Sequence, residues 1–302
     1  MLTVLTIAFY IAFSLVLLPY GYNTLVLMVS ASRYRLDTPE PLEEYPFVIV
    51  RLPVYNEVNV VERLIDSICA LDWPRNRLEI QVLDDSDDET VEIVNEKASY
   101  YGNRGFAIKV LRRSTRIGYK AAALQNGLRE AKGDFIALFD ADFVPPSTFL
   151  KKTVPHLVGK PSLGFVQTRW GFLNRLQNPL TKAVGLSLDS YHFIDQSGRQ
   201  ALGCFTGFNG SAGVFRTSAL NDVGGWNWDT LSEDMSFKLQ LKGWKGQYIR
   251  DVLVEGELPQ TMSAYRVQQA RWSKGSVQCA LKHLPSVWGS GLTLFQKVQA
   301  SL

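Results

Sequence analysis

The sequence predicts an α/β protein: a mainly parallel β-sheet with helices on both faces, an N-terminal transmembrane helix and C-terminal helices at the membrane interface. Short apolar runs alternate with segments of helical periodicity from residue 47 to residue 139. Such alternation is typical of parallel sheets covered on both sides. Residues 1–32 carry no charged side chain, and residues 258–302 carry five basic residues and no acidic one. Both terminal patterns favour contact with a membrane.

The apolar segment at residues 1–32 is long enough to cross a bilayer, which takes about 17–25 residues. Pro19 lies inside it, where we expect a kink that membrane helices tolerate. A cleaved signal peptide is the alternative, but no basic residue precedes the apolar run, and the run is longer than a signal core. Arg33 and Arg35 follow directly. Because basic residues favour the cytoplasmic side, we expect the remaining chain in the cytoplasm.

The rest of the chain divides into a polar, proline-rich linker at 33–46, a globular domain at 47–262 and amphipathic helices at 263–302. Apolar residues at helical spacing from Val61 to Ile68 define the first helix of the domain, and short apolar runs define its strands. In chain order the expected elements are a strand at Phe47–Arg51, a helix at Val58–Leu71, a strand at Leu78–Leu83, a helix at Thr90–Tyr100, a strand at Ala107–Leu111, a helix at Lys120–Ala131, a strand at Phe135–Phe139 and, further on, a helix at Met235–Lys242.

Composition excludes several classes of protein. Lys+Arg 32 against Asp+Glu 29 gives a net charge of +3, so no nucleic-acid partner is expected. Hydrophobic residues at 46% exclude a disordered chain. Three cysteines and three histidines are scattered and predict neither disulfides nor a zinc cluster. Glycine-rich phosphate-binding motifs are absent from the sequence, so a phosphate would be met by a metal on acidic residues.

Three of the predicted strands run into polar clusters, at 52–57, 84–88 and 140–142. The carboxyl ends of parallel strands meet at one edge of a sheet, where ligands bind, so we expect these clusters to lie together. Asp140 and Asp142 are two residues apart and point the same way on an extended chain. Two such oxygen donors suit Mg²⁺ or Mn²⁺ together with substrate phosphates, although a solvated strand end has the same pattern.

Asp85, at the end of another strand, can accept hydrogen bonds from a nucleobase or ribose. It can equally cap the helix that follows, a role for which Asp87 and Asp88 are better placed. Lys120 comes after a loop, residues 112–116, that carries three arginines. These cations can bind a diphosphate, or they can be exposed to solvent in a surface loop. We place Lys120 in the donor-binding site.

Two further motifs lie in the second half of the domain. Residues 207–213 are small, and their glycines permit close approach of a ligand to the backbone. Ser232 is the expected N-cap of the helix at Met235–Lys242, with Glu233 and Asp234 behind it. Acids in a first turn also stabilise a helix without any catalytic role.

The last motif is Gln268-Gln-Ala-Arg-Trp272, whose polar and aromatic residues lie near one another on a helix. Trp272 offers a flat apolar platform for a sugar acceptor, and Arg271 can reach a pyrophosphate. The alternatives are that Trp272 buries ring area and that Arg271 meets lipid phosphate.

These motifs, in this order, resemble the inverting family 2 glycosyltransferases, and more narrowly the processive, membrane-embedded branch that includes cellulose, mannan and hyaluronan synthases. The resemblance covers about residues 46–285 and implies a GT-A-like, Rossmann-like fold. Several stretches are most similar to plant mannan synthases and xyloglucan-backbone glucan synthases, namely Gln81–Ser86, Leu138–Phe143, Gln167–Trp170, Gly207–Gly210 and Gln268–Trp272.

The resemblance implies residue roles in the donor site. Tyr55 and Glu57 fall where the family holds the nucleotide, and Asp85 falls where it holds the base. Asp142, with Asp140, matches the metal and diphosphate position.

It also implies roles on the acceptor side. Asp234 matches the general base that deprotonates the acceptor hydroxyl. Gln268, Arg271 and Trp272 match the diphosphate- and acceptor-binding site.

The implied reaction transfers a hexose from UDP-glucose or GDP-mannose to a growing β-linked polysaccharide at the plasma membrane or the Golgi. A single displacement inverts the donor, so no serine or cysteine nucleophile is needed. Alternatives are a single transfer onto a lipid acceptor, such as ceramide or a polyprenyl phosphate, and a non-catalytic protein that binds sugar nucleotides. A sugar nucleotidyltransferase would not need the Gln268–Trp272 motif, and a glycosidase would not need a nucleotide pocket.

The sequence departs from the family in two places. Ser232 stands where the family usually has threonine, a change that keeps the hydroxyl. The chain stops at Leu302, where such synthases continue into further membrane helices, so we expect a truncated chain.

Overall fold

The computed structural model describes residues 2–128, 132–230 and 234–302. Seven strands form one sheet in the order β3-β2-β1-β4-β6-β5-β7. β6 is antiparallel to both of its neighbours, and the other neighbouring pairs are parallel. The strands are β1 (Val48–Val54), β2 (Leu78–Asp84), β3 (Ala107–Leu111), β4 (Phe135–Leu138), β5 (Leu163–Phe172), β6 (Gly213–Arg216) and β7 (Lys245–Gly256). The predicted fold class, a mainly parallel sheet, is confirmed.

Helices cover both faces of the sheet because successive strand residues point to opposite sides. Val48, Val50 and Leu52 of β1 belong to one core cluster, with α2 (Val61–Cys69), α3 (Thr90–Gly102) and α5 (Phe149–Gly159). Ile49 points to the other cluster, which is formed with α4 (Tyr119–Leu128), α8 (Thr217–Asp222) and α9 (Met235–Leu241). A short 3₁₀ helix, η1 (Arg75–Arg77), precedes β2.

The predicted elements are present, with shifted ends that have local causes. The helix expected from Val58 begins at Val61, because Asn56 adopts a positive φ of 54° and the chain turns before the helix. The helix expected at Lys120–Ala131 begins at Tyr119, after Gly118 with a φ of 76°. Its predicted last three residues, 129–131, lie outside the described residues.

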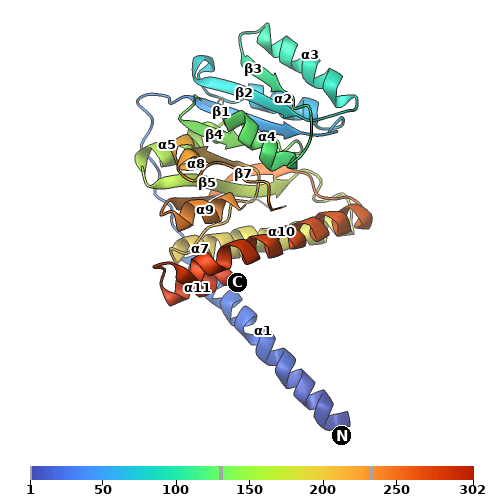
Figure 1. Ribbon diagram of the computed structural model, residues 1–302, viewed down its shortest axis with the longest axis vertical. Coiled ribbons are helices and arrows are strands. Elements are labelled where there is room, and N and C mark those ends of the chain that lie inside the picture. The colour runs from blue at the N-terminus through green and yellow to red at the C-terminus, as the bar shows by residue number, and fades with distance from the viewer. Residues whose placement is uncertain (1, 129–131, 231–233) are drawn as a thin grey trace.

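A second group of helices lies beyond the β7 edge of the sheet (Figure 1). It consists of α6 (Pro179–Ser190), a π-helical stretch η2 (Tyr191–Gln196), α7 (Ser197–Ala201), α10 (Met262–Gly289) and α11 (Leu294–Ser301). Tyr265 of α10 packs on a small cluster formed by Phe172, Val184 and Leu258, which joins this group to the sheet. The predicted helices within 263–302 are therefore present as α10 and α11.

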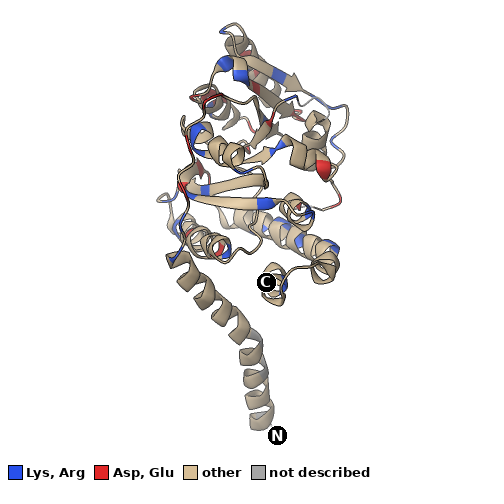
Figure 2. Ribbon diagram, turned by 90° about the vertical axis from the view of Figure 1, so that its left-hand side faces the viewer, with Lys and Arg blue, Asp and Glu red and all other residues tan. Residues whose placement is uncertain are grey.

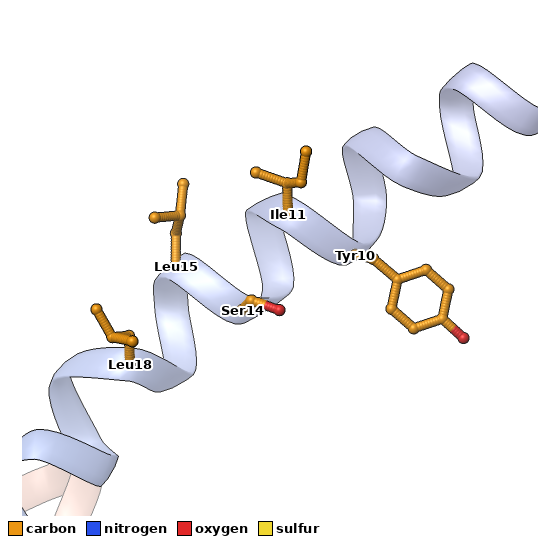
Figure 3. Close-up of a pocket in the computed structure, with 5 residues that line it drawn as sticks. All are labelled: Tyr10, Ile11, Ser14, Leu15 and Leu18. Atoms are coloured by element: carbon orange, nitrogen blue, oxygen red, sulfur yellow. The ribbon is translucent and has the colours of Figure 1, made fainter.

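The N-terminal helix α1 (Leu2–Ser32) projects away from the domain (Figure 1). Its large apolar side chains between Val4 and Val29 are mostly exposed, at 47% to 70%. Figure 3 shows Ile11, Leu15 and Leu18 extending outward from its ribbon. Figure 2 shows α1 without charged residues, whereas α10 carries Lys and Arg. Residues Thr3–Ser32 are long and apolar enough to cross a membrane, a criterion that a signal sequence also meets.

The C-terminal end of α1 is fixed to the domain by close packing. Leu27 is 1% exposed, and a Cβ on Gly198 of α7 would lie 2.5 Å from its carbonyl oxygen. The absence of a side chain at Gly198 therefore allows the two helices to touch. The Tyr34 hydroxyl donates to the Tyr248 carbonyl of β7 at 2.7 Å.

Candidate active site

The carboxyl ends of β1, β2 and β4 meet at one edge of the sheet, as the sequence predicts. The Asp85 amide donates to the Val54 carbonyl at 3.0 Å, and the Asn56 amide donates to the Ser86 hydroxyl at 3.0 Å. The Glu57 amide donates to the Thr90 hydroxyl at 2.9 Å. These bonds join the segment after β1 to the segment after β2, and so fix Tyr55 and Glu57 beside Asp85.

Glu57, Asp140 and Asp142 form an acidic group at this edge. Burial, together with the charges of Asp142 and Asp140, raises the pKa of Glu57 to about 7. Burial and the charge of Asp140 raise the pKa of Asp142 to about 7. Glu257, next to β7, adds to the repulsion on both carboxyl groups. Folding alone gains nothing from this arrangement, because like charges at close range repel.

The acidic group fits a divalent cation that shares its coordination with a substrate. Among the described residues, no three His, Cys, Asp or Glu side chains are arranged as a complete metal site. A cation such as Mg²⁺ or Mn²⁺ is commonly held by one or two carboxylates and completes its shell with phosphate oxygens and water. Asp140 and Asp142 supply the carboxylates, and a cation there would relieve the repulsion that, after burial, raises the pKa of Asp142.

Lys120, at the start of α4, connects Asp140 to the loop at residues 207–213. Its Nζ lies 2.8 Å from Asp140 Oδ1 and donates to the Gly210 carbonyl at 2.7 Å. The Asp140 amide donates to the Ser211 hydroxyl at 2.9 Å. A single ammonium thus stands beside the predicted metal ligand, where it can also contact a diphosphate.

The loop at residues 207–213 is held by the neighbouring strand. Gln167 of β5 is fully buried; its Nε2 donates to the Ser211 carbonyl at 3.0 Å, and its Oε1 accepts from the Asn209 amide at 2.8 Å. Ala212 adopts a positive φ of 59°, which is uncommon outside glycine. The stretch Gln167–Trp170 therefore holds in place the loop at residues 207–213, which contacts Asp140.

The arginines after β3 act within the protein rather than as free cations. Arg113 forms a two-pronged pair with Asp85 and also donates to the carbonyls of Ile117 and Tyr119, both at 3.0 Å. Asp85 thereby holds the loop that leads to Lys120. A carboxylate has further lone pairs, so Asp85 retains the capacity to accept from a base or ribose.

The two neighbouring arginines also have partners. Arg112 pairs with Asp84 at 2.7 Å. The Arg116 guanidinium lies 3.2 Å from the ring centroid of Tyr55. Asp88 accepts from the Thr90 amide at 2.9 Å at the start of α3, as expected of a cap, whereas Asp87 instead exchanges hydrogen bonds with Asn56.

Asp234 lies immediately before α9 and is 3% exposed. Its Oδ2 contacts Lys282 Nζ and lies 3.0 Å from His283 Nε2, both on α10. Burial raises the pKa of this carboxyl, but the hydrogen bonds from His283 and Lys282 outweigh it, so the pKa lies below its usual value. The segment before Asp234 contacts α4, where the Trp226 amide donates to the Gln125 side chain at 2.7 Å.

Gln268, Arg271 and Trp272 lie along α10, 10 to 14 residues before Lys282. A helix rises about 1.5 Å per residue, so the motif is roughly 15–21 Å from the helix turn that contacts Asp234. Among the described residues, no hydrogen bond or ion pair joins the motif to Asp140 or Asp142. Gln268 Oε1 is buried without a partner in the described structure. The structure therefore brings the donor-side residues together, and among the described residues no hydrogen bond links the α10 motif to Asp140 or Asp142.

Ser232 and Glu233, the residues expected beside Asp234, lie outside the described residues. Sequence reasoning missed Lys282, His283, Glu257 and Gln167 as neighbours of the site. Gln167 stands in a stretch that carries the resemblance, which is a usable signal. Lys282 and His283 are 48 and 49 residues from Asp234, with no local spacing that could have revealed them.

The fold is that of a GT-A-like glycosyltransferase. It is defined by a mixed sheet, by strands that end in acidic residues and by the buried Asp234. The family model described as "Glycosyltransferase like family 2" matches residues 46–275, and the chain belongs to that family. The model covers the sheet and the start of α10.

Several plant proteins are similar to the chain over most of its length. Glucomannan 4-beta-mannosyltransferase 9 of Arabidopsis thaliana is 42% identical over 262 residues, which are 84% of this chain and 49% of that protein. Glucomannan 4-beta-mannosyltransferase 1 of Oryza sativa subsp. japonica is 40% identical over 281 residues, 88% of this chain and 54% of that protein. The chain spans about half the length of these curated relatives.

Two solved structures share the fold. The mannosyltransferase PcManGT from Pyrobaculum calidifontis, in complex with GDP-Man and Mn²⁺, matches with a TM-score of 0.77 at 24% identity, over 97% of this chain and 80% of that one. S. aureus TarS 1–349 in complex with UDP-GlcNAc matches with a TM-score of 0.60 at 16% identity, over 84% of this chain and 70% of that one. At these identities the likeness shows the fold.

Proposed function

We propose that this chain is the catalytic part of a membrane-bound inverting glycosyltransferase that adds hexose to a growing β-linked polysaccharide. The observation that carries the proposal is the acidic edge of the sheet, where Glu57, Asp140 and Asp142 repel one another beside Lys120. A metal-bound nucleotide diphosphate is the ligand that such an edge accommodates. Because the plant relatives are named as glucomannan 4-beta-mannosyltransferases, we favour GDP-mannose over UDP-glucose as the donor of this chain.

Each residue of the donor site has a role in this proposal. Tyr55 and Asp85 hold the nucleoside, and Glu57 lies beside them. Asp140 and Asp142 hold Mg²⁺ or Mn²⁺, which when bound neutralises the diphosphate and stabilises it as the leaving group. Lys120 adds a further positive charge at the diphosphate.

On the acceptor side, Asp234 accepts the proton of the acceptor hydroxyl as the oxygen attacks the anomeric carbon. The bond to the diphosphate breaks on the opposite face, so an α-linked donor gives a β-linked product. Gln268, Arg271 and Trp272 bind the diphosphate and the acceptor sugar.

The proposal also assigns partners and location. Residues 1–32 anchor the chain in a bilayer, residues 33–46 link the anchor to the domain at 47–262, and residues 263–302 lie at the membrane surface. The exposed apolar length of α1 and the basic, acid-free C-terminal region support this arrangement. The catalytic domain is placed in the cytoplasm, where sugar nucleotides are made, at the plasma membrane or the Golgi.

The variant Asp234→Asn tests the assignment of the base. We expect GDP-mannose binding to stay within about twofold of wild type and transfer to fall about 10²–10⁴-fold, because the amide keeps the shape but cannot accept the proton. Binding is measured by calorimetry with Mn²⁺, and transfer by incorporation of labelled mannose into β-manno-oligosaccharide. Near-normal turnover in this variant would place the base elsewhere.

A further inference from the structure

Asp234 is held from one side by two consecutive residues of α10. Lys282 Nζ and His283 Nε2 both contact the same oxygen, Oδ2. Among the described residues, no hydrogen bond reaches Oδ1. Of the two carboxylate oxygens, Oδ2 is the one that the described residues anchor to α10.

The two donors are themselves fixed. Lys282 also pairs with Asp229 at 2.7 Å, and Asp229 lies in the segment before Asp234. The His283 ring is 7% exposed and stacks on Phe237 of α9, with ring centroids 5.8 Å apart and an interplanar angle of 11°. Donors that have second contacts of their own favour one direction for the carboxylate.

Burial makes these contacts important for the charge of Asp234. A carboxyl group that is 3% exposed and lacks a partner would favour its protonated form. A protonated carboxyl group cannot accept the proton of an acceptor hydroxyl. The ammonium of Lys282 and the ring N–H of His283 supply the positive charge and the hydrogen bond that keep the group ionised.

We propose that Lys282 and His283 are positioning residues for the base: they anchor Oδ2 of Asp234 and leave Oδ1 for the acceptor hydroxyl. This inference rests on the proposed function of Asp234. It gives α10 a second role, since the same helix carries the proposed acceptor-binding residues Gln268 to Trp272. The base and the acceptor site are then connected through a single rigid element.

Other charged or titratable groups face Asp234 and have to be considered in a pH experiment. Among the described residues they are Lys238 on α9, Asp229 in the preceding segment and Cys279 on α10, in addition to Lys282 and His283. Lys238 Nζ donates to the Gly225 carbonyl at 2.6 Å and makes no hydrogen bond to Asp234. Lys282 and His283 are therefore the direct donors among these groups.

The test measures kcat/KM for transfer of labelled mannose from GDP-mannose to β-manno-oligosaccharide at pH 6 and pH 8, with saturating Mn²⁺. Lys282→Met removes the charge at similar length, and Lys282→Arg restores it. His283→Gln keeps a donor near the position of Nε2. Lys274→Met, which removes an exposed lysine of the same helix, is the matched control. GDP affinity is measured in parallel to verify the donor site.

We expect the ratio of kcat/KM at pH 8 to that at pH 6 to rise several-fold in Lys282→Met, because the pKa of Asp234 rises when the ammonium is lost. Lys282→Arg and His283→Gln should stay near the wild-type ratio, as should Lys274→Met, with GDP affinity unchanged throughout. A wild-type ratio in Lys282→Met, or faster transfer at both pH values, would overturn the positioning role. If Lys282→Met contradicts the positioning role while Asp234→Asn is inactive, the proposed function still stands. If Asp234→Asn is active, both the positioning role and the proposed function are wrong.

Discussion

Asp142 carries the clearest electrostatic cost at the donor site. It is partly buried, and burial together with the charge of Asp140 raises its pKa to about 7. Lys120 offsets part of this repulsion through its contact with Asp140 at 2.8 Å. A divalent cation and a diphosphate would complete the charge balance, which is the electrostatic reason to regard this edge as a donor site rather than a structural ion-pair network.

Replacing Asp142 with alanine should remove the metal dependence of nucleotide binding. Loss of one carboxylate leaves the diphosphate charge uncompensated, so we expect added Mn²⁺ to strengthen GDP binding in wild type by at least about tenfold and in Asp142→Ala by much less. Calorimetry with and without Mn²⁺ measures this. Asp72→Ala, which removes a surface carboxylate paired with Lys151, is the control. Equal Mn²⁺ dependence in wild type and Asp142→Ala would exclude Asp142 as a ligand.

The sequence predicted best those positions in the fold that follow from local spacing. Asp140 and Asp142 follow a buried strand, and the parallel order of β1, β2 and β4 brings their strand ends together. The pairing of Asp85 with Arg113 and of Asp234 with Lys282 could not be predicted in this way. Those contacts depend on how loops and helices distant in sequence pack, which no periodicity records.

Among the helices and strands, α10 connects the proposed base to the proposed acceptor-binding residues. It is a continuous helix from Met262 to Gly289 that contacts Asp234 near one end and carries Arg271 and Trp272 about three turns earlier. Its helical state was predictable from the sequence, because the basic and apolar residues alternate at helical spacing. The placement of α10 could not be predicted, because the contact of Lys282 with Asp234 joins two elements that are separated by β7.

Trp272→Ala should lose polymer synthesis while retaining GDP binding. An indole ring that stacks on the terminal acceptor sugar contributes about 0.5–1.5 kcal/mol beyond the area it buries, which corresponds to a loss of acceptor affinity of about 2- to 13-fold. Product length on gels or by chromatography measures the effect, and donor hydrolysis to water should persist. Trp288→Ala, at the far end of the same helix, is the matched control. Polymer of normal length from Trp272→Ala would leave Trp272 as a packing or lipid-contacting residue.

At the scale of the whole molecule, the sheet lies at one end and the apolar helix α1 projects from the other (Figure 1). Between them lie α7, α10 and α11, so α10, which carries the proposed acceptor-binding residues, lies on the side of the sheet from which the anchor projects. The sheet with its covering helices followed from the alternation of apolar runs, and the apolar helix α1 followed from the uncharged start of the chain. The sequence patterns did not predict the contact of Leu27 with Gly198, which fixes α1 to the domain.

The basic residues after α1 predict the side of the membrane on which the domain lies. Arg33 and Arg35 directly follow an uncharged span, so the domain should face the cytoplasm. Protease protection measures this in sealed membranes. In plasma-membrane vesicles we expect the domain to be shielded in right-side-out vesicles and digested in inverted ones, with a protected marker enclosed in the vesicles as the control for integrity. The reverse pattern would refute the orientation.

The measurement that tests the central claim most directly is incorporation of label from a panel of nucleotide sugars into product, in membranes that contain the full chain. The panel comprises GDP-mannose, UDP-glucose and UDP-N-acetylglucosamine, with Asp234→Asn membranes as the blank. We predict that GDP-mannose labels an insoluble glycan that endo-β-mannanase degrades, and that the blank does not. Label found solely in a solvent-extractable lipid, or no incorporation from any donor, would contradict the assignment as a β-glycan synthase.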